Sequence, residues 1–147
     1  MGGRWTRIVV VVLGLALMAS FGLSALGGTA TSRPDTAQLL QRYDQASTAY
    51  WSTGTTDEAV VAEALRASRA SFVDNGIMIE HASVSSTVSQ VTSADGRLTV
   101  VADVTSSWQL RQQASGQLQD ASSTDAHRLV FDERTGQLLS DDFLPQG

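Results

Sequence analysis

The stretch RLTVVADVTSSWQLR, residues 97–111, constrains the fold more than any other part of the chain. Apolar side chains occupy most alternate positions, and the positions between them are polar except for Val101. The apolar set is Leu98, Val100, Ala102, Val104, Trp108 and Leu110. Such alternation predicts a β-strand with one face in a core and the other in water. Asp95-Gly96 directly before it suits a tight hairpin turn, so we expect the preceding segment to pair with it.

That preceding segment, which starts at Ile77, also alternates with a period of two, but its apolar positions change parity along the way. Ile77 and Ile79 share one parity, Val84 and Val88 share the other, and Val91 returns to the first. A one-residue slip in parity is what a β-bulge introduces. The pattern therefore predicts a strand with one or two bulges, or one that bends across a sheet.

The C-terminal third contains a further hairpin. Ala114-Ser115-Gly116 predicts a turn, and residues 127–131 and 137–140 predict two short strands joined by a turn at 132–136. Residues 117–126, QLQDASSTDA, are so polar and serine-rich that a strand and a long solvated loop remain equally good interpretations.

Two amphipathic helices are predicted ahead of the strands. The first begins at Asp35 or Thr36, whose side chains can cap a helix, and ends near Gly54. The second begins after Thr55 and Glu58, which have capping-box spacing, and ends at 74–76. On the first helix, one side is formed by Leu39, Leu40, Tyr43, Ala46, Ala49 and Tyr50.

These elements predict an α+β fold: an N-terminal apolar helix, then two helices packed on a curved antiparallel sheet of three to four strands. We divide the chain into residues 1–30, a signal peptide or single transmembrane anchor, a linker at 31–34, and an α+β extracytoplasmic domain at 35–144. Two helices and one sheet leave no reason to expect a second domain in 147 residues.

The N-terminus predicts the location of the domain. Arg4 and Arg7 precede an uncharged apolar run at residues 8–26. Positive charge before such a run keeps the N-terminus in the cytoplasm and sends the following chain across the membrane. The run is long enough to cross the membrane as an anchor, and it is also followed by small residues typical of a signal-peptide cleavage site. Both interpretations place the domain outside the cytoplasm, either on the cytoplasmic membrane or secreted.

Composition excludes several functions. The formal net charge is −5 and the cations are scattered, which argues against a nucleic-acid surface. The chain has no cysteine, and therefore no disulfide, thiolate ligand or cysteine nucleophile. The two histidines lack the spacing of a known metal motif. We expect no metal and no cofactor.

The candidate ligand-binding residues are Trp108, Asp103, His81 and Tyr50, which suit a pocket between sheet and helices. Tyr50 and Trp108 can equally be core residues, and Asp103 can be a carboxylate on the polar face of its strand. Asp125 and His127 are two residues apart and would share a strand face, as an acid–imidazole dyad requires, although a solvated role is the simpler interpretation. No catalytic residue is assigned.

The order of elements, together with the C-terminal pattern of His127, Phe131, Gly136, Asp141 and Asp142, resembles the NTF2-like/cystatin-like superfamily. Within it, the chain looks like small ectodomains of actinobacterial envelope proteins, such as Mce-associated membrane proteins or the accessory domain of cell-wall amidases. The third helix that NTF2-like enzymes usually have is not found in this sequence, and the amidase domain is absent. The resemblance implies an accessory role and transfers no catalytic residue.

Two functions follow as hypotheses. The first is an exported or membrane-anchored accessory domain that acts by protein–protein interaction in the cell envelope, with an unknown envelope protein as its partner. The alternative is a small-ligand-binding or isomerase-like protein with a cavity between sheet and helices. The second predicts an internal pocket with polar groups directed into it.

Overall fold

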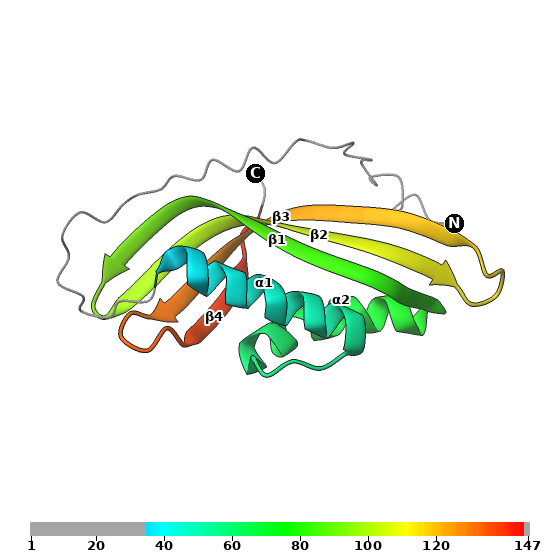
Figure 1. The fold of residues 1–147 in the computed structure, drawn as a ribbon, viewed down its shortest axis with the longest axis horizontal. Coiled ribbons are helices and arrows are strands. Elements are labelled where there is room, and N and C mark those ends of the chain that lie inside the picture. The colour runs from blue at the N-terminus through cyan, green and yellow to red at the C-terminus, as the bar shows by residue number, and fades with distance from the viewer. Residues whose placement is uncertain (1–34, 146–147) are drawn as a thin grey trace.

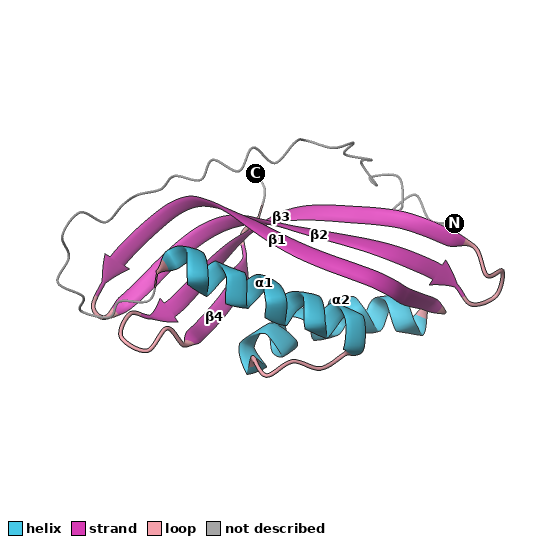
Figure 2. Ribbon diagram, in the orientation of Figure 1, coloured by secondary structure: helices cyan, strands magenta, loops and turns pink. Residues whose placement is uncertain are grey.

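The computed structural model describes residues 35–145, which form two helices and one four-stranded sheet (Figures 1 and 2). The elements in chain order are α1 (Thr36–Thr53), α2 (Ala59–Asp74), β1 (Ile77–Ala94), β2 (Arg97–Gln112), β3 (Leu118–Asp132) and β4 (Leu138–Phe143). The α+β class, with helices followed by an antiparallel sheet, is confirmed for these residues.

The sheet is an antiparallel meander in the order β1-β2-β3-β4. Asp95 and Gly96 both have positive φ, 54° and 74°, and form the predicted hairpin turn between β1 and β2. The polar segment at 117–126 is strand from residue 118 onward, in register with β2. Its backbone hydrogen bonds to β2 hold it extended, although its side chains supply little apolar area.

Both parity changes in β1 are β-bulges, as predicted. The register with β2 shifts between Ile79 and His81 and again between Val88 and Gln90. Each bulge adds one residue to β1 and increases its local twist. The long strands bend over the two helices, which cover one face of the sheet (Figure 1).

The helix ends follow the sequence in three of four cases. The side chain of Asp35 accepts a hydrogen bond from the Ala37 amide at 3.2 Å, and Gly54 closes α1 in a left-handed conformation with φ 79°. Gly76, φ 71°, follows α2. The predicted capping box is wrong: Glu58 is itself the N-cap and makes no side-chain capping bond. The amide of Glu58 instead donates to Thr56 Oγ1 at 3.4 Å, so a local turn replaces the cap.

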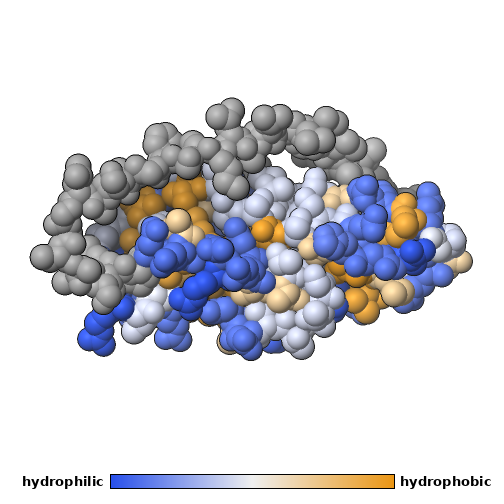
Figure 3. Space-filling model, in the orientation of Figure 1, coloured by the Kyte–Doolittle hydropathy of each residue, from blue (hydrophilic) through white to orange (hydrophobic). Residues whose placement is uncertain are grey.

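The core lies between the helices and the concave face of the sheet. Val61, Val100 and Leu129 are completely buried there. The remaining apolar members are Leu39, Leu40, Tyr43, Tyr50, Trp51, Leu65, Ala82, Val84, Ala102, Val104, Phe131 and Leu138. The outer face of the helices is mostly polar, with apolar atoms in separate small patches (Figure 3).

Side chains of α1 cap the free edge of β1. Thr48 Oγ1 accepts from the Val84 amide at 3.0 Å, and Asp44 accepts from the Ser86 amide at 3.1 Å and from its hydroxyl at 2.5 Å. Because Asp44 and Thr48 are one helical turn apart, and Val84 and Ser86 are two apart on a strand, both bonds form on the same edge. Capped amides no longer offer a template for another strand.

The predictions for residues 1–30 and 31–34 lie outside the described residues. Within 35–145, no helix is both long and apolar enough to cross a membrane.

Asp44→Asn tests the burial of Asp44 where α1 meets β1. Burial raises the pKa of Asp44, so the folded state holds its proton more tightly than the unfolded chain does. The stability that this group contributes is therefore greatest below the ordinary aspartate pKa of about 3.9 and is lost as pH rises through the raised folded pKa. Urea unfolding across acidic pH should show wild type losing stability relative to Asp44→Asn as pH increases. Asp103→Asn, an exposed aspartate on β2, is the control. A parallel profile for Asp44→Asn and wild type would contradict the burial of Asp44 against β1.

Candidate functional site: a cavity between sheet and helices

A cavity of about 530 Å³ lies between the concave face of the sheet and the two helices. The helices contribute Tyr43, Ser47, Trp51, Leu65, Ala67, Ser68, Ser71 and Phe72, and the sheet contributes Val84, Val104, Ser106, Trp108, Ser123, Asp125, His127 and Phe143. Ala67, Ser68 and Ser71 of α2 are exposed, as is Phe143 of β4, so the cavity opens between these two elements. Its volume falls in the range of small-molecule sites.

A buried polar network joins α1, β3 and β4 at one end of this cavity. Asp141 Oδ1 lies 2.6 Å from His127 Nδ1, and Asp141 Oδ2 accepts from the Tyr43 hydroxyl at 2.8 Å. The Tyr43 hydroxyl also lies 3.4 Å from His127 Nδ1. The Asp141 side chain is completely buried, and that of His127 is 4% exposed. One carboxylate thus orients both an imidazole and a phenol.

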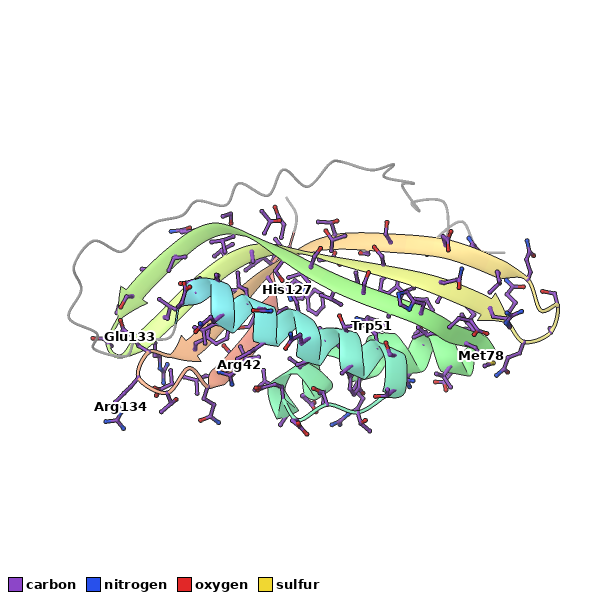
Figure 4. All side chains as sticks on the ribbon, viewed as in Figure 1. Arg42, Trp51, Met78, His127, Glu133 and Arg134 are labelled. Atoms are coloured by element: carbon purple, nitrogen blue, oxygen red, sulfur yellow. The ribbon has the colours of Figure 1, made fainter. Side chains whose placement is uncertain are left out.

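The network determines which ring nitrogen of His127 is left for a ligand. A carboxylate that already accepts a hydrogen bond from Tyr43 acts as an acceptor toward Nδ1, so the imidazole proton is assigned to Nδ1. In the neutral ring, Nε2 then carries the lone pair. Nε2 has no partner among the described residues and is not fully enclosed. Figure 4 places His127 between the sheet and α1.

Tyr43 serves this network as a proton donor. Burial is the main cause that raises the pKa of its hydroxyl well above the ordinary value, and the negative charge of Asp141 raises it further. The phenol therefore stays protonated throughout the physiological range and continues to donate to Asp141.

A β-bulge places Asp141 on the inner face of the sheet, behind His127. Phe131 pairs with Leu138, but Val130 pairs with Ser140, so Leu139 is the extra residue of β4. Simple alternation from the inward Leu138 would have placed residue 141 on the outer face. The bulge reverses the parity, and Asp141, opposite Leu129, faces inward. Sequence reasoning used Asp141 and Asp142 only as part of the C-terminal pattern and missed this role.

Asp125 and His127 do share the inner face of β3, as their spacing predicts, because both line the cavity. No dyad forms between them, and the burial of His127 excludes the solvated role for its ring. His127 pairs with Asp141 instead, while Asp125 accepts a hydrogen bond from Ser123 at 2.8 Å. Two residues on one strand face stand side by side and do not point at each other, whereas β4 brings Asp141 across to the imidazole.

An aromatic cluster forms the wall of the cavity toward the other end. Trp51, Phe72 and Trp108 make edge-to-face contacts, with ring centroids 5.0 to 5.8 Å apart. The Nε1 atoms of both tryptophans and Ser47 Oγ are buried without a hydrogen-bond partner. Buried polar atoms in a well-packed core normally have a hydrogen-bond partner, so these three atoms are unusual.

The structure separates the four predicted ligand-binding residues. Trp108 lines the cavity. Tyr50 is 8% exposed and belongs to the core, outside the set of cavity-lining residues. His81 of β1 and Asp103 of β2 are exposed and do not line the cavity either; the adjacent Ala82, Ala102 and Val104 are buried, so Asp103 lies on the outer face.

Within residues 35–145, no three histidine or acidic side chains gather as a metal ion would require. Comparisons with protein-family models, curated proteins and solved structures find no match to this chain.

Asp141→Ala tests the polar network. The substitution removes the acceptor of two buried donors, so we expect the free energy of unfolding to fall by about 3 kcal/mol. The neighbouring exposed residue gives a matched control, and Asp142→Ala should change stability by less than about 0.5 kcal/mol. Urea denaturation measures both. Equal effects of the two substitutions would show that the network does not hold the fold.

Proposed function

We propose that this domain binds a small organic molecule in the cavity between its sheet and its helices. The supporting observation is the combination of an open cavity of about 530 Å³ with a buried imidazole in its lining, whose Nε2 has no hydrogen-bond partner among the described residues. Sites of this kind are mostly apolar, with a few polar groups held in fixed orientation. His127 is held in this way by Asp141.

The physical cost of the arrangement supports the same proposal. A sheet–helix interface is normally packed to crystal density, and polar groups buried there carry a desolvation cost that hydrogen bonds must offset. Here the inner face of β3 presents Ser123, Asp125 and His127 to the helices in succession. An apolar series at these positions would make a more stable core. An isomerase-like activity, the enzymatic form of this function, would need a proton acceptor in the cavity, and His127 Nε2 has the required chemistry.

Ser106→Phe tests whether ligands occupy the cavity. Ser106 faces Val84 and Ser123 across the sheet on the inner face, so a phenyl ring there takes up cavity volume. Ser107→Phe adds the same ring on the other face of β2 and is the matched control. Ligand-observed NMR with a library of small organic fragments should give hits on wild type and Ser107→Phe that are lost on Ser106→Phe. Hits that bind all three proteins equally would place the binding elsewhere and overturn the proposal.

A second candidate is the accessory role in the cell envelope, acting through an open sheet edge. β4 pairs with residues 127–131 of β3 only, so residues 118–125 pair with β2 on one side and with no described strand on the other. On the opposite edge, side chains of α1 cap the amides of Val84 and Ser86 in the middle of β1. An open edge is suited to strand addition by a partner. The export segment at residues 8–26 would place this edge outside the cytoplasmic membrane, as an anchored or secreted protein.

Edge-directed crosslinking tests this candidate. Ser122→Lys with Thr124→Lys puts charge on the open edge and should remove partners that crosslink to wild type in intact envelopes. Ser85→Lys with Thr87→Lys makes the same change on the capped edge and should retain them. The candidate fails if no reproducible partner is captured, or if both variants behave alike. N-terminal sequencing of protein from membrane and medium tests the location; a cytosolic product would contradict it.

A further inference from the structure

Two hydrogen-bond acceptors remain free at the β3 end of the cavity, while the unpartnered indole N–H donors of Trp51 and Trp108 belong to the aromatic wall. His127 Nε2 is an acceptor in the neutral ring, as argued above. Asp125 uses Oδ2 to accept from Ser123, which leaves Oδ1 with no partner among the described residues and not fully enclosed. Both atoms belong to residues two apart on the inner face of β3, so their side chains lie side by side. A ligand that reaches both must donate hydrogen bonds.

The charge of the cavity restricts the ligand further. Asp125 lines it directly, and Asp141 lies behind His127. None of the described residues that line the cavity is an arginine or lysine. In a partly desolvated site a carboxylate attracts a cation strongly and repels an anion.

The opposite wall suits the rest of such a ligand. Trp51, Phe72 and Trp108 provide aromatic surface for an apolar group, and aromatic rings also attract cations. The site therefore has acceptors and negative charge at the β3 end and an aromatic wall at the other.

We infer that the cavity selects organic ammonium compounds with an apolar or aromatic body. The ammonium group donates to Asp125 Oδ1 and His127 Nε2, and the body packs on the aromatic wall. Carboxylates and phosphates of the same shape are excluded by the charge of Asp125 and Asp141. This inference rests on the proposed function, because it requires that the cavity binds ligands at all.

Three probes with one skeleton test the inference: 4-phenylbutylamine, 4-phenyl-1-butanol and 4-phenylbutyrate. The full-length chain carries Trp5→Phe, so that tryptophan fluorescence reports Trp51 and Trp108 alone. Lipid nanodiscs accommodate the apolar N-terminus. At neutral pH we expect saturable quenching by the amine with a Kd at least tenfold lower than that of the acid, with the alcohol between them.

Asp125→Asn keeps the shape of the side chain and removes its charge. It should raise the Kd of the amine at least fivefold and leave that of the alcohol unchanged. Asp120→Asn, an exposed change on the same strand, should alter neither Kd. Ser106→Phe should abolish quenching by all three probes.

The outcomes separate this inference from the proposed function. If the acid binds as tightly as the amine, or if Asp125→Asn has no effect on the amine, the selection of ammonium compounds is overturned while binding in the cavity stands. If none of the probes binds, the inference is also overturned, and the fragment experiment with Ser106→Phe decides the proposed function independently. Binding that survives Ser106→Phe overturns both.

Discussion

The carboxylate of Asp141 is the point on which the architecture of the site depends. It accepts hydrogen bonds from Tyr43 of α1 and from the ring of His127 on β3, and β4 carries it. One buried group therefore fixes a helix, a strand and the edge of the sheet relative to one another. It also sets the tautomer of the imidazole that faces the cavity. A charge without partners would be costly at this depth, and here two donors compensate its desolvation.

Most of the fold follows from local patterns in the sequence. Alternation over residues 97–111 predicts β2, the parity changes from Ile77 predict both bulges of β1, and the apolar periodicity from Asp35 predicts α1. These elements are predictable because their own side chains determine which face is buried. The first half of β3 is not predictable in this way. Its side chains are mostly polar and show no alternation, and its extended backbone depends on pairing with β2.

The site was less predictable than the fold for a related reason. The bulge at Leu139 leaves no sequence signal as clear as the one in β1, because β4 is six residues long and contains too few alternations to reveal a slip. Without that slip, residue 141 falls on the wrong face and the network cannot be recognised. The spacing of Asp125 and His127 gave the correct face but the wrong partner. His81 and Asp103, named as candidate ligand-binding residues, are both exposed, and Asp103 is the carboxylate on the polar face of its strand that the alternation also allowed. Trp108 is the one of the four candidates that lines the cavity.

The meander topology of the sheet keeps most strand pairings short in sequence separation. Each strand pairs with its neighbour in the chain, so the strands can pair outward from each turn, and only short loops have to be closed, at a small entropic cost. The hydrogen bond from Tyr43 to Asp141, in contrast, spans 98 residues. Within the polar network, this hydrogen bond is therefore the contact with the largest entropic cost of loop closure. A ligand bound in the cavity would offset this entropic cost by stabilising the folded state, and the stabilisation would be greatest where α1 packs on the end of the sheet.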